Sequence, residues 1–203
     1  MPNKPAVLWP DALALTALFL LLALLPAISS SLEYLRAPIR EGEYWRLFTA
    51  HFVHLNFSHA LLNAAGVVLI VWVFPQELSR RDWWIIVMLA PLLISAGLWW
   101  KQPGLAGYAG FSGVLHGLLY FAALRLWQTS RWLAVGMLLL LCGRQAWEQT
   151  AAYNPDYLRT VIGGRVMPDA HLFGGLAGLL YGAVALWCDR HRARLGKAPL
   201  AGL

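Results

Sequence analysis

Charged residues are scarce in this chain. Asp, Glu, Lys and Arg make up 13% of its 203 residues, whereas soluble domains average about 25%. Hydrophobic residues make up 59% of the chain, and the mean hydropathy is +0.56. This balance excludes an ordinary water-soluble domain and predicts an integral membrane protein.

Cysteine is also rare, and the patterns typical of metal sites are missing. Cys142 and Cys188 fall at different expected depths, so we expect free thiols rather than a disulfide. The histidines form no HExxH pattern and have no Glu beside them, which disfavours zinc. Haem between two helices and a midplane transport site are disfavoured because the polar residues gather near one end. We therefore predict no metal and no cofactor.

Apolar segments of spanning or nearly spanning length recur along the chain. They lie at about 11–31, 52–74, 83–100, 112–127, 132–147 and 169–187. We predict a single all-α membrane domain over residues 1–203, built as a bundle of six transmembrane helices. The first segment is longer than the apolar run of a signal peptide, so we expect an uncleaved helix. Residues 150–168 are a candidate cap loop, and residues 188–203 are a candidate cytoplasmic tail.

The distribution of Lys and Arg predicts the orientation. With a cytoplasmic N-terminus, nine Lys and Arg, from Lys4 to Lys197, fall on the inner side and seven on the outer side. The positive-inside rule then predicts that both termini are cytoplasmic. The net charge of +6 reports topology rather than a nucleic-acid partner, and membrane lipid is the expected surrounding.

Polar residues inside the expected spans gather at one depth. His59 and Asn63 lie one helical turn apart, Ser112 opens the fourth span, and His171 lies at the start of the sixth. Spans two, four and six run in the same direction, so their N-terminal ends share the outer side of the membrane. Polar groups in lipid are costly, and their convergence there favours a functional site.

These residue types suit acyl transfer. A serine at a helix start is most often an N-cap, but a serine beside a histidine base is a nucleophile, and His171 is the candidate base for Ser112. The Ser112 backbone N–H, the Asn63 amide and the His59 ring are candidate oxyanion donors. Small residues at four-residue spacing let two helices approach closely, and they also serve plain packing. They are Gly113, Gly117, Gly174, Gly178 and Gly182.

The ordered motifs resemble those of the rhomboid intramembrane serine proteases. The resemblance covers roughly residues 42–187 and rests on Glu43-Tyr44-Trp45-Arg46-Leu47-Phe48-Thr49, then His54, His59 and Asn63, then Gly110-Phe111-Ser112-Gly113, then His171 with Gly174 and Gly178. It implies a six-helix rhomboid fold and a Ser112–His171 dyad without a third acid. It also implies an oxyanion site with His59 and Asn63, and cleavage of a transmembrane substrate near its outer end. His54, Gly110, Gly113 and His116 are possible supporting residues around this site.

One departure from the family pattern narrows the resemblance. Many rhomboids have a tyrosine four residues after the nucleophile, stacked on the catalytic histidine, where this chain has His116. His116 either stacks on His171 and tunes it or is simply a packed polar group. The Ser112–Gly117 run, the short 32–44 loop and the start of the last helix look most like the rhombosortase branch.

The rhombosortase resemblance implies a substrate class and a location. That branch processes exported bacterial proteins carrying a C-terminal Gly-Gly signal, an apolar helix and a basic tail. The expected enzyme is a multi-pass protein of the bacterial inner membrane with its active site towards the outer side, and the cut falls at small residues. The alternatives are a general rhomboid protease for other single-span substrates and a non-cleaving rhomboid-like binder of membrane helices. We also expect the 150–168 loop to cap Ser112 and to move with the fifth helix to admit substrate.

Overall fold

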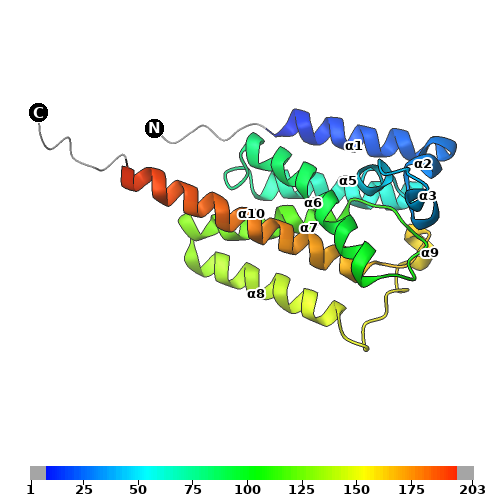
Figure 1. Cartoon of the computed structure of the whole chain (residues 1–203). Coiled ribbons are helices and arrows are strands. Elements are labelled where there is room, and N and C mark those ends of the chain that lie inside the picture. Colours follow the sequence, from blue (N-terminus) through cyan, green and yellow to red (C-terminus); the bar gives the residue numbers. More distant parts are fainter. Residues whose placement is uncertain (1–7, 196–203) are drawn as a thin grey trace, which may run out of the picture.

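The computed structural model describes residues 8–195, with side chains up to residue 192. Residues 1–7 and 196–203, including Lys4 and Lys197 of the topology argument, lie outside the described residues. Within residues 8–195 the chain is mostly helical (Figure 1). In chain order the elements are α1 (Trp9–Ala23), α2 (Pro26–Leu32), β1 (Tyr34–Leu35), α3 (Arg36–Arg40), α4 (Arg46–Thr49), α5 (Phe57–Val73), α6 (Arg80–Lys101), β2 (Gly107–Tyr108), α7 (Ser112–Arg125), a 3-10 turn (Leu126–Gln128), α8 (Arg131–Glu148), α9 (Arg159–Ile162) and α10 (Pro168–Leu195).

The long helices form one bundle with α7 and α10 at its centre. Helix α10 packs mainly on α7 and α6, while α1 packs on α5 and α5 on α7. Helices α1 and α8 lie on opposite sides of the bundle (Figure 1). The short elements α2, α3 and α9 gather at the end of the bundle opposite the start of α1 and the end of α10 (Figure 1). This end also carries the N-termini of α5, α7 and α10, so it collects the polar residues singled out above.

Membrane-spanning length and hydropathy are met by α6 and α10, and by a third span if the bent pair α1 and α2 is counted as one. Helix α5 has 17 residues and α7 has 14, both short of the roughly 20 that a span needs. Helix α8 has 18 residues but carries Arg131, Arg144 and Glu148. The mostly helical fold is thus confirmed, whereas the six-span arrangement stays a proposal.

Large apolar side chains point outward from the bundle. The exposed ones include Leu61, Leu62 and Leu69 on α5, Leu139 and Leu140 on α8, and Leu176, Leu180 and Val184 on α10. Exposed apolar surface on this scale is unusual on soluble monomers. In a membrane, lipid tails would cover this surface. Cys142 and Cys188 are both free thiols, as the sequence predicts.

The helices of the structure differ from three of the expected segments. The first segment is not one helix, because α1 and α2 are bent by 108° at Pro26, which disfavours a helical residue before it and lacks an N–H. The second helix begins at Phe57 rather than residue 52, because Asn56 caps it by accepting from the His59 N–H. The last helix continues to Leu195, since the polar residues after position 187 include good helix formers. The expected tail therefore begins as helix.

A short ribbon holds the connector that leads to Ser112. Tyr34 pairs with Tyr108 and Leu35 with Gly107 in antiparallel register. The buried Arg36 side chain donates to the carbonyls of Leu98, Trp99, Gln102 and Leu105. The Trp99 carbonyl lies in the last turn of α6, where helix carbonyls lack partners within the helix. These contacts fix the segment between α6 and α7, and nothing in the sequence pattern predicts them.

Candidate active site

The N-terminal ends of α5, α7 and α10 surround one cavity of about 440 Å³. Ser112 and His171 line it together with the two candidate oxyanion residues, His59 and Asn63. The rest of the wall is mostly apolar and comes from the connector before α7 and from the segment between α8 and α10. The cavity is lined by Leu55, His59, Leu62, Asn63, Leu105, Gly107, Tyr108, Ala109, Ser112, Leu115, Tyr157, Leu158, Ile162, Gly164, Arg165, Val166, Met167 and His171.

Ser112 is the first residue of α7, and its hydroxyl does not cap the helix. The N-cap position belongs to Phe111, and no side-chain cap hydrogen bond is formed there. The N-cap interpretation of Ser112 is therefore wrong. Its Oγ instead lies 3.0 Å from His171 Nε2, within the reach that proton transfer requires. The hydroxyl thus makes no capping hydrogen bond at the helix start and is paired with a candidate base.

His171 lies in the first turn of α10, and this end of the helix is anchored to α6. The buried Asp169 carboxylate accepts from Lys101 Nζ at 2.6 Å and from Gln102 Nε2 at 2.5 Å. An acidic residue in the first turn also suits the helix dipole. These contacts hold the α10 N-terminus, and with it the His171 ring, against the end of α6.

Close approach of α7 and α10 brings the two side chains together. A Cβ added at Gly174 would lie 1.9 Å from the Gly113 carbonyl oxygen, and one at Gly178 would lie 2.0 Å from the Gly117 oxygen. Only glycine fits such backbone contact. The four-residue glycine spacing therefore marks the seam between α7 and α10 on which the Ser112–His171 contact depends.

A carboxylate that the sequence argument missed contacts His171. Glu148 Oε2 lies 2.8 Å from His171 Nδ1, and the Glu148 side chain is 1% exposed. An acid thus contacts the histidine, where the family resemblance implies a dyad without a third acid. Glu148 ends α8, whose C-terminus lies at the same end of the bundle as the N-terminus of α10. The signal in the sequence is a charged residue, Glu148, at the end of an apolar segment that finishes on the same side as the start of the last one.

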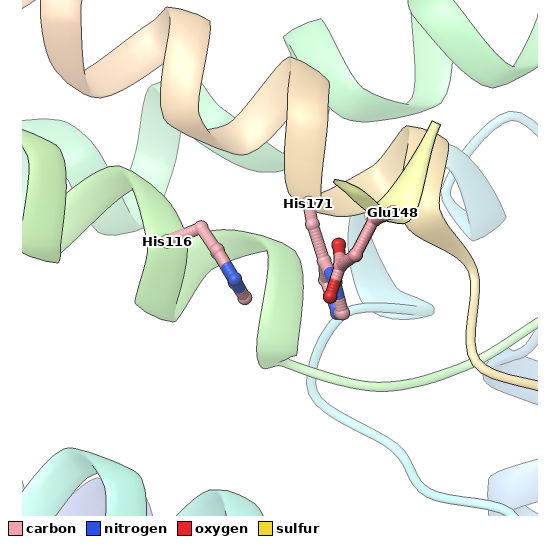
Figure 2. A group of neighbouring side chains, drawn as sticks. All are labelled: His116, Glu148 and His171. Carbon is pink, nitrogen blue, oxygen red and sulfur yellow. The ribbon is translucent and has the colours of Figure 1, made fainter. Parts of the chain in front are cut away.

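His116 lies against the other side of His171. The two rings stack with centroids 4.1 Å apart and an angle of 15° between their planes, and His116 Nδ1 pairs with the Ser112 carbonyl oxygen at 2.8 Å. His116, Glu148 and His171 converge from three helices (Figure 2). Nearly parallel stacked rings direct their nitrogen lone pairs along separate planes, so the two imidazoles are poorly arranged to share one metal ion.

The candidate oxyanion residues come from α5. Asn63 Nδ2 donates to the His59 carbonyl at 3.0 Å, which orients the amide at the cavity wall. A Cβ at Gly110 would lie 2.8 Å from His59 Nε2, and Gly110 has a φ of +130°. Glycine is thus required there both for the backbone conformation and for the approach of the His59 ring.

His51 and His54 lie behind the cavity rather than in it. His51 Nε2 pairs with Ser95 Oγ at 3.0 Å, and this hydroxyl donates to the Leu47 carbonyl, so the ring nitrogen is the donor in that pair. The His54 ring packs edge-on against His59 at 5.0 Å. Within residues 8–192 the three histidines His51, His54 and His59 do not gather as metal ligands, so the zinc alternative gains no support from them.

The segment between α8 and α10 lines one side of the cavity. It contains α9, and its residues Tyr157, Ile162 and Val166 line the cavity. Asn56 ties it to the start of α5, because Asn56 Nδ2 donates to the Val161 carbonyl at 3.0 Å. The location of residues 150–168 is therefore compatible with a cap.

Comparison with known proteins agrees with this arrangement. The model of the Rhomboid family, described as a rhomboid domain, matches residues 41–188, well over half of the chain. The putative rhomboid protease YdcA of Bacillus subtilis (strain 168) is 26% identical over 80 residues, which are 39% of this chain and 40% of that protein. The alignment thus spans less than half of that relative. The family match covers the cavity, its polar residues and the α7–α10 seam, and the chain belongs to the rhomboid family.

Proposed function

We propose that this protein is an intramembrane serine protease in which Ser112 is the nucleophile and His171 the general base. The observation that carries the proposal is the 3.0 Å contact between Ser112 Oγ and His171 Nε2 at the wall of a cavity. Membership of the rhomboid family supports the same reaction. The six apolar segments are the proposed membrane spans, with both termini cytoplasmic.

The proposed reaction is acyl transfer followed by hydrolysis. Ser112 Oγ attacks the scissile carbonyl carbon while its proton passes to His171 Nε2. The developing oxyanion accepts from the Ser112 N–H, which has no partner within the first turn of its helix, and from the His59 ring and the Asn63 amide. The C–N bond then breaks as the proton on His171 moves to the leaving amine. A water that gives a proton to the same ring attacks the acyl-enzyme ester, and the Ser112–acyl bond breaks as this proton returns to Ser112 Oγ.

The proposed substrate is an exported protein with a C-terminal Gly-Gly signal, a transmembrane helix and a basic tail. The Ser112–Gly117 run and the Asp169-Ala170-His171-Leu172 start of α10 support this choice through their resemblance to rhombosortases. The enzyme would work in the bacterial inner membrane with its cavity towards the outer side. General cleavage of other single-span substrates is the alternative.

A tailed reporter tests this substrate choice. Purified protein in liposomes is incubated with a reporter bearing Gly-Gly before its transmembrane helix, and the new C-terminus is read by mass spectrometry. A matched reporter with Val-Val at the same place is expected to be cut at least about tenfold more slowly, since a recessed serine excludes branched side chains. Equal cleavage of both would favour a general rhomboid protease. Persistence of both reporters uncut would favour a non-cleaving binder of membrane helices.

The segment of residues 150–168, between α8 and α10, is the proposed gate. Asn56 and Val161 join it to α5, so a disulfide engineered between these two neighbouring positions would hold it closed. We expect reporter cleavage to fall at least about tenfold under oxidising conditions and to recover on reduction, because substrate enters through this segment. Cleavage that is indifferent to the cross-link would contradict a gate here.

His116 is proposed to keep the His171 ring in place by stacking on its face. Aromatic stacking contributes about 0.5–1.5 kcal/mol, so we expect His116→Ala to lower the cleavage rate roughly 2- to 12-fold. His116→Phe keeps an aromatic face over His171 and is expected to stay within about threefold of the wild type. Steady-state cleavage of the tailed reporter checks both variants. A His116→Phe variant as slow as His116→Ala would indicate that the ring nitrogens matter, not the stack.

A further inference from the structure

The proposed reaction of Ser112 and His171 assigns no role to the acid that contacts His171. Glu148 Oε2 lies 2.8 Å from His171 Nδ1 (Figure 2). The contact joins the last residue of α8 to the first turn of α10 and spans 23 residues of sequence. The Glu148 side chain is 1% exposed and the His171 side chain 9%, so water does not compete for this hydrogen bond.

The second oxygen of the same carboxylate is also bound. Arg144, one turn earlier on α8, places its Nη2 atom 2.9 Å from Glu148 Oε1. A buried carboxylate is stable only when its charge is compensated and its lone pairs are used. With one oxygen bound to Arg144 and the other facing His171, the carboxylate has a fixed orientation.

This orientation decides which nitrogen of His171 carries the proton. An ionised carboxylate only accepts hydrogen bonds, so Nδ1 must be the N–H donor. Nε2 then carries a lone pair, and this is the atom that faces Ser112 Oγ at 3.0 Å. The contact with Glu148 thus selects the one neutral tautomer that can receive the serine proton.

We propose that Glu148 is a positioning residue that completes a Ser112–His171–Glu148 triad, an inference that rests on the proposed protease function. During attack the proton moves from Ser112 Oγ to His171 Nε2, and later from Nε2 to the leaving amine. Glu148 gains and loses no proton. It holds the tautomer and orientation of the ring and stabilises the imidazolium that forms.

Glu148 belongs to α8, a helix that buries few of its side chains. Its buried side chains are Ala134, Gln145 and Glu148, so two of the three are polar and lie near its C-terminal end. Gln145 Nε2 donates to the Pro168 carbonyl at 3.3 Å. At this end of α8, Glu148 contacts the His171 ring directly, whereas Gln145 contacts only a backbone carbonyl.

The decisive variant is Glu148→Gln. Arg144 requires an acceptor, so the new amide oxygen faces Arg144 and the NH₂ faces His171 Nδ1. That nitrogen must then accept, which moves the ring proton to Nε2 and removes the base. We expect kcat for the tailed reporter to fall at least about 10²-fold with KM within about threefold of the wild type, since an acid-to-amide change in a known triad acts through the wrong tautomer.

A second substitution is expected to restore activity. Arg144→Met removes the guanidinium while keeping much of its stem, so in the Glu148→Gln/Arg144→Met double variant the amide can turn and offer its oxygen to His171. We expect the double variant to be at least about tenfold faster than Glu148→Gln alone. Glu148→Asp keeps an acceptor-only group and is expected to lie between the wild type and Glu148→Gln. A purely structural role for Glu148 predicts no such recovery from a second loss.

Two controls distinguish a failure of the triad inference from a failure of the proposed protease function. Gln145→Ala disturbs the same end of α8 without touching His171, and its kcat is expected to stay within about fivefold of the wild type. The inference is overturned if Glu148→Gln cleaves within threefold of the wild type while Ser112→Ala is inactive, a result that leaves the protease function standing. It is also overturned if the double variant is no faster than Glu148→Gln, or if Gln145→Ala loses as much kcat as Glu148→Gln. Absence of cleavage by the wild type would overturn the proposed function itself.

Discussion

Ser112→Ala is expected to reduce cleavage of the tailed reporter by at least about 10³-fold, because the attacking oxygen is gone and no neighbouring group replaces it. The loss should come without unfolding. The Ser112 hydroxyl makes no cap hydrogen bond at the start of α7, and its side-chain contact is with His171. Removing one such hydrogen bond costs about 1 kcal/mol of stability. Reporter cleavage and thermal unfolding, measured on the same purified sample, separate the two effects.

A matched serine controls for the substitution itself. Ser130 stands at the N-cap position of α8 and also forms no side-chain cap hydrogen bond, but it lies at the opposite end of that helix from Glu148. Ser130→Ala is expected to cleave like the wild type. A Ser112→Ala variant that retains more than a tenth of wild-type cleavage would contradict the assignment of the nucleophile.

The second large effect is expected at the seam between α7 and α10. In Gly174→Ala the new Cβ would lie 1.9 Å from the Gly113 carbonyl oxygen, a backbone atom that has no rotamer to escape into. Overpacking of this kind costs about 1–3 kcal/mol or more. Moving α7 and α10 apart also lengthens the 3.0 Å contact between Ser112 and His171. A misplacement of about 1 Å can lower a rate about 10²-fold, and we expect a loss of that order.

Two glycines on another helix provide the comparison. Nothing lies within 4 Å of a Cβ added at Gly136 or Gly143 on α8. Gly136→Ala and Gly143→Ala are expected to raise stability by up to about 1 kcal/mol, because alanine is the better helix former. Thermal unfolding in detergent and reporter cleavage would be measured for all three variants. A Gly174→Ala variant as stable and as active as the α8 variants would show that the helices do not depend on this close contact.

The sequence predicts the pairing of Ser112 with His171 through helix direction. The second, fourth and sixth of the expected spans run the same way, which places His59, Ser112 and His171 at one end of the bundle. The four-residue glycine spacing adds the close approach of α7 and α10. Both arguments depend on periodicity and length, which a sequence records directly.

The features missed depend on long-range contacts between individual side chains. Glu148 belongs to a helix of opposite direction, and its pairing with His171 follows from the docking of one helix end, which periodicity does not describe. The β1–β2 ribbon and the Arg36 contacts depend on two loops that are far apart in the sequence. The bend between α1 and α2 had a local signal in Pro26, but the apolar run around it conceals the break.

The chain contains a second serine paired with a histidine, and it shows what distinguishes the proposed nucleophile. Ser95 Oγ lies 3.0 Å from His51 Nε2 but donates its proton to the Leu47 carbonyl. Ser95 is 1% exposed, and it does not line the cavity that contains Ser112. A close serine and histidine are therefore not sufficient, since the ring nitrogen must accept from the serine and the hydroxyl must face the substrate.

The most direct test of the Ser112 assignment is to locate the adduct formed by a labelled fluorophosphonate. This reagent reacts with activated serine hydroxyls, and mass spectrometry of the digested protein identifies the modified residue. We expect one adduct, on the peptide containing Ser112, with labelling abolished in His171→Ala. An adduct on Ser95, or an unmodified Ser112 in wild-type protein that cleaves the reporter, would contradict the account.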